Sequence, residues 1–430
     1  MNSAQPNNLT FRSKIFDFIK RQVKQIREGG LLVFWRKIFT ILHILLMLPF
    51  ALPVVLIIRL LRLFIVIRFR QLRSDRIGHF AMNTEVYLCE RDAGINAPTK
   101  PFIDIWYTMP YVCNAQIKRM WNRILHIWPA ILVEPVDRLS RLLPWGEAHI
   151  IAWRYYQDRD IYGALMRVPP HLTFKPQEEE TGQAGLRTLG VAHGKPFVCF
   201  HNRDSAYLDK VFRNGNFRYH DYRDSNIHNY TLAAEQLTLR GYYTIRMGAV
   251  VKEALDVSNS RIIDYAVSGH RSDFMDIYLG AKCTFFITSG TGIDAIPEMF
   301  RRPLMNVNYV PLEDVRSWNA SHLTIFKKHW LRNEHRFMTF QEIIESGAGL
   351  FRYSEQYEQF GIELIENTQE EIAALAIEMD NRIKETWQTT EEDEELQRRF
   401  WSLFKPSELH GEIKSRIGAD FLRQHRDWLQ

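Results

Sequence analysis

A loop rich in serine and glycine follows an apolar segment in the second half of the chain. Residues 283–288 are apolar and β-prone, which predicts a strand buried on both faces, and a helix is expected over 293–300. The loop between them consists of Ser289, Gly290, Thr291 and Gly292. Because glycines let the backbone approach a ligand and a helix N-terminus favours an anion, this pattern predicts a phosphate site, although an ordinary strand-to-helix turn has the same pattern.

A second group of polar residues follows a predicted buried strand over 197–201. It consists of His201, Arg203 and Asp204. Open α/β sheets bind ligands at the carboxyl ends of their strands. At that place Arg203 can bind a phosphate with two hydrogen bonds and Asp204 can orient it, or the two can form an ion pair that only stabilises a turn.

A third group opens the helix that precedes the serine and glycine loop, and it consists of Arg271, Ser272 and Asp273. Ser272 or Asp273 is expected to cap this helix, which leaves Arg271 for a ligand. All three groups fall at junctions between strands and helices of one predicted sheet. Their convergence predicts a pocket for a nucleotide diphosphate, whose negative charge is met by two arginines, loop amides and a helix dipole.

Other ligand classes lack their motifs in this sequence. There is no G-x-x-x-x-G-K-[ST] segment and no G-x-G-x-x-G after the first strand, which argues against P-loop NTPases and NAD enzymes. The four cysteines lie far apart without a C-x-x-C pair, so neither a zinc site nor a disulfide framework is indicated, and a reducing cytosol fits best.

The N-terminal part of the chain carries the basic excess. Residues 1–76 contain 14 Lys and Arg against 3 Asp and Glu, whereas the remainder contains 41 against 47. Within 11–28, apolar residues at helical spacing share one face and basic residues crowd the rest, which suits an anionic membrane surface. No motif that reads a base sequence accompanies this helix, so no nucleic-acid partner is expected.

An apolar stretch of 21 residues without a formal charge follows at 38–58. It is just long enough to span a bilayer, but Pro49 and Pro53 interrupt it and basic residues flank both ends. A true span and a broken, re-entrant or surface-lying segment therefore stay open. Either way, residues 11–70 predict attachment at the cytosolic face of the inner (plasma) membrane, peripheral or through a single segment.

From residue 62 onward, strands and helices alternate, which predicts an α/β fold with parallel sheets covered on both sides. The first half is expected to contain strands over 63–69, 102–107 and 130–133, followed by loops over 134–175. The second half predicts a Rossmann-like domain, with strands over 197–201, 242–245, 262–266, 283–288 and 304–309. A terminal helix is expected over 411–428.

At 430 residues the chain is long enough for two domains and appendages. The expected segments are a basic amphipathic segment (1–37), a membrane-associated hydrophobic segment (38–60), an N-terminal Rossmann-like acceptor domain (62–190), a C-terminal Rossmann-like nucleotide-sugar domain (191–385) and C-terminal helices (386–430).

Four motifs together carry a resemblance to a known family. They are H-N-R-D at 201–204, Y-x-x-R-M-G ending at Gly248, R-S-D-F-M-D beginning at Arg271, and T-S-G-T-G-x-x-A-x-P at 288–297. This combination resembles a bacterial family of glycosyltransferases associated with surface-polysaccharide genes, over roughly 63–404. The layout also resembles the GT-B fold, in which two Rossmann-like domains face each other across a cleft and the C-terminal one holds the nucleotide sugar.

The resemblance implies roles for single residues. Fucosyltransferase-like GT-B enzymes have a similar H-x-R whose arginine binds the β-phosphate, and the match here is Arg203. A ribose-binding glutamate is expected after the glycine loop, where Glu298 comes two positions later than in the GT-B pattern. The base is expected from the N-terminal half: His79, which follows Gly78 much as in the GT-B enzyme that makes lipid II, or alternatively Asp75.

Sugar transfer without a metal is implied as well, with the departing diphosphate stabilised by arginine and a helix dipole. No metal ligands and no cofactor other than the donor sugar are expected, and the nearest D-x-D, at 158–160, lies in a region without a clear pattern. The expected function is transfer of a sugar from a nucleotide diphosphate sugar to a lipid-linked or polysaccharide acceptor. A sugar-nucleotide epimerase or hydrolase, and a non-catalytic scaffold of a polysaccharide assembly complex, are the alternatives.

Overall fold

The computed structural model describes residues 11–152, 157–206, 210, 218–405, 407 and 409–429. The chain forms two compact units. The smaller unit consists of Met1–Arg70, Pro98–Tyr107 and Trp128–Ile151, and the larger unit consists of Gln71–Ala97, Thr108–Ile127 and Ala152–Gln430. The expected domain boundaries, which are contiguous along the chain, stay a prediction.

One long helix, α1 (Phe11–Leu61), opens the smaller unit. It continues through Pro49 and Pro53, where sequence reasoning allowed a break, and is interrupted instead at Gly30, whose φ of 62° lies in the left-handed region that favours glycine. The predicted apolar face over 11–28 depends largely on side chains outside the described part, such as Phe11 and Ile15. Within the described ranges, no helix combines the length and apolar character needed to cross a membrane.

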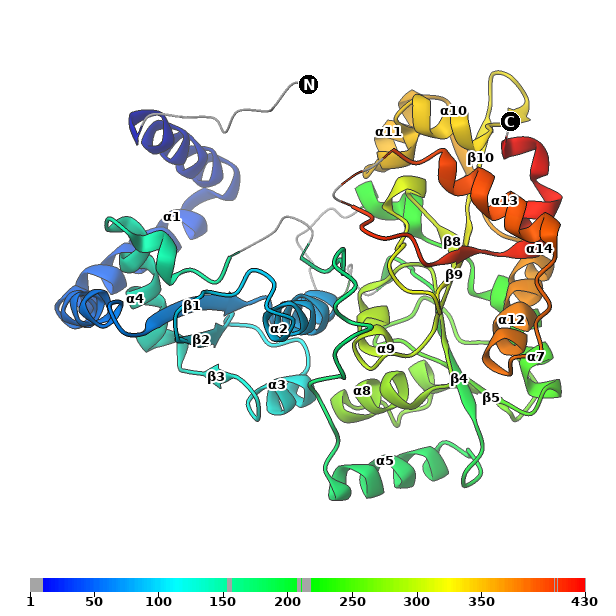
Figure 1. Cartoon of the computed structure of the whole chain (residues 1–430), viewed down its shortest axis with the longest axis horizontal. Helices are drawn as coiled ribbons and strands as arrows, with labels where there is room; N and C mark the ends of the chain where they lie inside the picture. Colours follow the sequence, from blue (N-terminus) through cyan, green and yellow to red (C-terminus); the bar gives the residue numbers. More distant parts are fainter. Residues whose placement is uncertain are drawn as a thin grey trace. The chain divides into compact units, whose positions relative to one another are not determined.

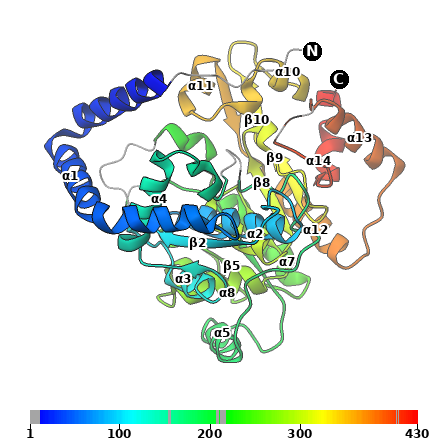
Figure 2. The ribbon, with the colours of Figure 1, turned by 60° about the vertical axis from the view of Figure 1, so that its left-hand side comes forward.

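The second half of α1 packs on α4 (Ala130–Leu142) (Figure 2). Ala51, Val55 and Ile58 of α1 meet Val133 and Val136 of α4 in a small apolar core. The same core receives side chains from the neighbouring strands β1 (Val66–Leu72) and β2 (Phe102–Thr108). The predicted strand over 130–133 and the start of the predicted loops over 134–175 are wrong, because the apolar residues of this segment recur at helical spacing.

A seven-stranded sheet forms the centre of the larger unit. All neighbouring strands are parallel, and their order is β6-β5-β4-β7-β8-β9-β13. Numbered along the chain this order is 3-2-1-4-5-6-7, whose first six positions are the order of doubly wound nucleotide-binding sheets. The α/β class with a parallel sheet is therefore confirmed. The strands are β4 (Phe197–His201), β5 (Tyr243–Arg246), β6 (Ile262–Asp264), β7 (Phe286–Thr288), β8 (Leu304–Tyr309), β9 (Leu323–Phe326) and β13 (Arg416–Ile417).

Both faces of this sheet are covered by helices (Figure 1). Val198 and Phe200 of β4 pack in a core with α7 (Thr231–Leu239) and α12 (Gln369–Ile383). Phe197 and Cys199, which alternate with them, pack in a second core with α5 (Pro176–Thr188) and α8 (Asp273–Lys282). Because neighbouring residues of β4 are buried on opposite sides, the strand is apolar throughout, as a strand buried on both faces requires.

Shorter elements complete the larger unit. Two of them replace the helix predicted over 411–428: β13 extends the edge of the sheet beside β9, and α14 follows at Ala419–Gln424. A small antiparallel sheet consists of β11 (Arg336–Phe337), β10 (Lys328–Leu331) and β12 (Ile362–Ile365). The other α-helices and strands of the described residues are α2 (Thr84–Asp92), α3 (Ala115–Trp121), β3 (His126–Ile127), α9 (Ala295–Met299), α10 (Phe340–Glu345), α11 (Ser354–Gln359) and α13 (Glu391–Ser402).

Candidate active site

A pocket of about 380 Å³ lies within the larger unit, at the carboxyl ends of β4, β5 and β7. The strand order reverses between β4 and β7, and doubly wound sheets bind their ligands at that switch point. The volume falls within the usual range for ligand pockets, ~300–1,000 Å³. Of the predicted site residues, those that line the pocket are Asp75, His79, His201, Arg203, Asp204, Gly248, Arg271, Gly290, Thr291 and Gly292.

Arg203 is held at the end of β4 by two interactions. Its backbone N–H donates to Ser289 Oγ at 2.9 Å, which joins the end of β4 to the loop after β7. Its Nε donates to Asp224 Oδ1 at 3.1 Å. Burial raises the pKa of Asp224 to about 6, with the charge of Arg203 acting in the opposite direction. Asp224 therefore orients the guanidinium within the pocket wall.

The predicted partner of this arginine, Asp204, has another role. Its two carboxylate oxygens accept the backbone N–H groups of Ala206 (3.0 Å) and Lys252 (3.1 Å). Asp204 thus joins the loops that follow β4 and β5 through hydrogen bonds. The prediction that it orients Arg203 is wrong. The distant Asp224 takes that place, a pairing that the sequence carries no local signal for.

His201 and Gly248 form the wall between β4 and β5. His201 Nδ1 lies 3.0 Å from the carbonyl oxygen of Met247, and burial lowers the pKa of this imidazole, which favours its neutral form. A Cβ added at Gly248 would lie 2.6 Å from Val251 Cγ1. A side chain at this position would therefore require Val251, in the loop after β5, to shift.

The serine and glycine loop folds around Thr288, the last residue of β7. Thr288 Oγ1 accepts the N–H groups of Gly290 (3.1 Å) and Thr291 (3.4 Å). Gly290 has a φ of 75°, which glycine permits, and its carbonyl oxygen accepts a hydrogen bond from Arg223 Nη2. Two of the amides that were expected to face a phosphate are thus used within the loop itself.

The helix predicted over 293–300 is shorter than expected. A 3-10 turn over Gly292–Asp294 leads into α9, which has five residues and contains Pro297. Asp294 is buried in this turn and pairs with Arg316 Nη2 at 3.0 Å. A short helix that begins beside a carboxylate offers little positive potential to an anion, so the positive charge of the pocket comes mainly from arginine side chains.

Glu298 does not line the pocket. Its carboxylate is buried and accepts hydrogen bonds from Arg316 Nη1 (2.8 Å) and Trp318 Nε1 (3.0 Å). Burial raises the pKa of Glu298 to about 7. Because both oxygens are engaged inside the fold, the structure does not support the predicted ribose-binding role.

In the group at the start of α8, Ser272 and Asp273 make contacts within the fold, and Arg271 lines the pocket. Ser272 Oγ accepts the N–H of Met275 at 3.1 Å, so Ser272 is the cap. Asp273 Oδ2 accepts the N–H of Ala115 at 2.7 Å, and neither residue lines the pocket. Arg271 does line it, paired with Asp276 at 2.6 Å, and burial raises the pKa of Asp276 to about 6.

The two candidate bases lie in the loop after β1, which reaches the serine and glycine loop. A Cβ added at Gly78 would lie 3.0 Å from both the Cα and the carbonyl oxygen of Gly292, so the two backbones are in direct contact. His79 begins a π-helix over His79–Asn83, and its Nδ1 lies 3.3 Å from Asn83 Oδ1. Asp75 pairs with Arg73 at 3.4 Å. The structure thus brings His79 and Asp75 to the same pocket as Arg203 and Arg271.

Sequence reasoning missed several lining residues. Arg76 lies in the same loop as His79, and within the described ranges neither Arg76 nor Arg223 has a carboxylate partner. The R-S-D-R-I-G-H segment could have drawn attention to Arg76. Arg223 ends a 3-10 helix (Arg218–Arg223) and Arg316 comes from an irregular segment, and neither stands in a recognisable sequence pattern. Asp158 of the D-x-D pair also lines the pocket, while Asp160 is buried and accepts the N–H groups of Ala164 and Leu165.

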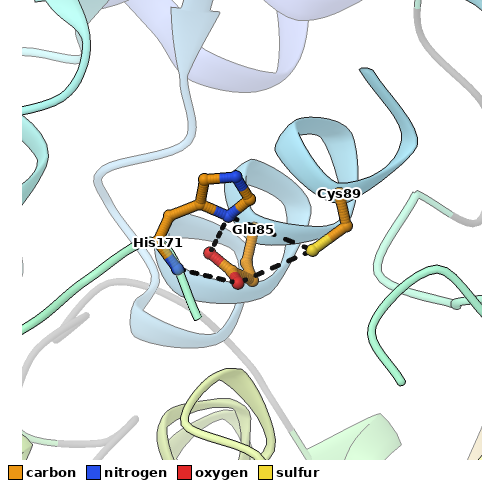
Figure 3. A group of neighbouring side chains, drawn as sticks. All are labelled: Glu85, Cys89 and His171. Atoms are coloured by element: carbon orange, nitrogen blue, oxygen red, sulfur yellow. Dashed lines mark hydrogen bonds and ion pairs between the residues drawn. The ribbon is translucent and has the colours of Figure 1, made fainter. Parts of the chain in front are cut away.

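A cluster of side chains from α2 and the segment at residue 171 has the residue types of a metal site. Glu85 and Cys89 of α2 point toward His171, and His171 Nδ1 lies 3.2 Å from Glu85 Oε2 (Figure 3). Arg301 Nη2, however, lies 2.8 Å from Glu85 Oε1 and 3.2 Å from Cys89 Sγ. Its guanidinium supplies the positive charge that a metal ion would bring, so we interpret this cluster as a buried ion-pair network.

This network makes stability depend on pH. Burial alone would lower the pKa of His171, but hydrogen bonds and ion pairs to Glu85 and then Asp92 outweigh it and raise the pKa. The contribution of protonated His171 to stability is therefore complete below about pH 6.5, the unperturbed pKa of histidine. It is lost as the pH rises through the pKa of His171 in the folded state. We expect the wild-type melting temperature to fall more steeply over this range than that of His171→Gln. Equal pH profiles would contradict the prediction, and His193→Gln, at an exposed loop histidine, is the control.

Comparisons with known proteins give distant likenesses. No family model and no curated protein matches the chain. Among solved structures, the ADP-heptose LPS heptosyltransferase II of E. coli is 13% identical, with a TM-score of 0.38 over 73% of this chain and 100% of that one. A glycosyl transferase family 9 protein from Veillonella parvula is 9% identical, with a TM-score of 0.42 over 75% of this chain and 97% of that one. At these scores, conclusions about this chain depend on its own site.

Proposed function

We propose that the chain is a glycosyltransferase that moves a sugar from a nucleotide diphosphate sugar to a lipid-linked or polysaccharide acceptor in surface-polysaccharide biosynthesis. The observation that carries this proposal is the composition of the pocket at the switch point of the doubly wound sheet. Arginines that suit a diphosphate and two candidate bases line the same pocket. The motif combination of the sequence supports the choice of acceptor class.

The arginines suit a diphosphate that leaves without a divalent ion. Arg203 and Arg271 each keep one carboxylate partner, while Arg223 is held by the carbonyl oxygen of Gly290. Guanidinium groups in fixed positions stabilise the charge that develops on a departing phosphate, and they need no reorganisation at the moment of reaction. We propose that the donor β-phosphate lies against Arg203, with Arg223 and Arg271 beside it.

The proposed reaction is a displacement at the anomeric carbon of the donor. An acceptor hydroxyl oxygen bonds to that carbon while the bond from the carbon to the β-phosphate oxygen breaks. The hydroxyl proton passes to His79 or Asp75, and the nucleoside diphosphate leaves with both electrons of the broken bond. Two features of the pocket support this scheme: both candidate bases line it, and the Gly78–Gly292 contact holds their loop beside the serine and glycine loop.

We place this reaction at the cytosolic face of the inner membrane. Cys89, Cys113, Cys199 and Cys283 are free thiols, which suits a reducing compartment. The basic excess of the first 76 residues favours an anionic lipid surface.

Two measurements test the function. UDP, GDP, dTDP and CMP compounds are first screened for thermal stabilisation of the full chain, and at least one is expected to raise the melting temperature. The matching donor, labelled in its sugar, is then incubated with lipid-linked and oligosaccharide acceptors. Label recovered on an acceptor supports the transferase. Label that stays on the nucleotide in a new configuration, or is released to water, supports the epimerase or hydrolase, and no thermal shift with any compound supports the scaffold.

A further inference from the structure

The outer side of α1 is apolar where a water-facing helix is normally polar. Over residues 51–60, Ala51, Val55 and Ile58 are buried against α4 and its neighbours. Four other apolar residues of this segment are exposed instead: Leu52, Leu56, Ile57 and Leu60 are 40%, 53%, 55% and 71% exposed. A helix that is apolar on both sides has a second partner besides its own core.

The exposed surface continues beyond the end of α1. Leu63 and Phe64, in the turn that follows, are 73% and 76% exposed. Arg59 donates to the carbonyl oxygens of Ser140 (2.9 Å) and Trp145 (3.0 Å), which places the exposed Trp145 beside this end of the helix. We call the exposed apolar side chains of residues 46–64 the outer apolar face.

Basic residues accompany this face. Arg59 and Arg62 lie among the C-terminal residues of the outer apolar face. Neither arginine has a carboxylate partner within the described ranges. The first 76 residues are strongly basic. Two aromatic side chains earlier in α1, Trp35 and Phe39, are also exposed. This combination suits the surface of an anionic bilayer. The acyl region accommodates the apolar and aromatic side chains, and the anionic headgroups attract the arginines.

We propose that the outer apolar face docks on the surface of an anionic phospholipid bilayer, with α1 lying in the plane of the interface. The positive charge of the segment favours an anionic bilayer over a second copy of the chain as the binding partner. Two copies would bring their basic helices together, and like charges repel. This inference narrows the expected membrane attachment from residues 11–70 to residues 46–64. It does not depend on the proposed reaction.

Sedimentation of the full chain with vesicles tests the proposal. The wild type is expected to sediment with phosphatidylcholine vesicles that contain phosphatidylglycerol, and less with phosphatidylcholine alone. The triple variant Leu56→Gln/Leu60→Gln/Phe64→Gln removes three exposed apolar side chains, and its partition to anionic vesicles should fall by about tenfold or more. Glutamine is a good helix former, so α1 should stay folded.

The matched control is Leu239→Gln/Phe360→Gln, which removes exposed apolar side chains from the larger unit and should bind as the wild type does. Equal binding by the triple variant, or equal loss in the control, would overturn the assignment of this face. A wild type that stays in the supernatant but changes from dimer to monomer on the triple substitution, measured by light scattering, would identify a second copy as the occupant. Circular dichroism of all three proteins reports whether they fold alike.

Discussion

Arg203→Ala is expected to weaken the binding of the best nucleotide diphosphate by roughly 100-fold, measured by isothermal titration calorimetry. The substitution removes the proposed charge-assisted hydrogen bonds to the phosphate. Such bonds contribute ~1.5–3 kcal/mol each, and 1.4 kcal/mol corresponds to a factor of ten in Kd. An unchanged affinity in a folded variant would refute the donor site as assigned.

Two further variants separate ligand binding from folding. Removal of Arg203 leaves Asp224 without its ion-pair partner, so some loss of stability is expected in Arg203→Ala. Asp224→Asn keeps the arginine but weakens its orientation, and should reduce affinity by less. Arg332→Ala, at an exposed pair with Glu363, is the matched control and should leave affinity unchanged. The order Arg203→Ala, Asp224→Asn, Arg332→Ala in decreasing loss of affinity is the expected result.

His79→Ala should lower kcat by about 100- to 10,000-fold, the range typical of a general base, while donor affinity stays close to that of the wild type. This expectation follows from the position of His79 in the pocket, on the loop that contacts Gly292, whereas the arginines proposed to hold the diphosphate come from other segments of the chain. Steady-state rates with a labelled donor, together with calorimetry of the donor alone, give the two quantities.

The alternative base has its own variant. Asp75→Asn keeps the shape of the side chain and removes its charge, and a small effect on kcat is expected if His79 accepts the proton. A large loss of kcat in Asp75→Asn with a small loss in His79→Ala would reverse the assignment. A loss of donor affinity equal to the loss of kcat in His79→Ala would show that the residue binds the donor instead of acting in the chemical step.

Buried strands were the most predictable elements of this fold. The strands expected over 197–201 and 304–309 coincide with β4 and β8, because an uninterrupted apolar run bounded by turn residues has few other uses. The run Ala130–Val133 was ambiguous for the same reason, since four apolar residues fit a strand or one turn of a helix, and packing against α1 selects the helix. The edge strand β13 has two residues and carries no periodic signal at all.

The site was predictable where it follows strands directly. His201, Arg203, Arg271 and the serine and glycine loop lie next to β4, β7 and α8, so the topology brings them together once the parallel sheet is inferred. The partners of these residues were not predictable. Asp224 and Arg316 come from irregular segments, and Arg316 enters the wall because two buried carboxylates attract it, a cause that exists only in three dimensions. Asp204 was expected to orient Arg203 because the two residues are adjacent in the sequence, but the carboxylate that lies beside the guanidinium belongs to Asp224.

The contact between Gly78 and Gly292 makes substitutions in one loop depend on a loop that is distant in the sequence. Gly78 leaves the space that the backbone of Gly292 occupies, so a side chain at position 78 would require the loop at 292 to shift, whereas a Cβ added at Gly292 would lie at an ordinary contact distance of 3.5 Å from the backbone N of Gly78. Such a step would displace the candidate base and the serine and glycine loop together. Related sequences should therefore keep the glycine at position 78 or change both loops together, although 213 residues lie between positions 78 and 292.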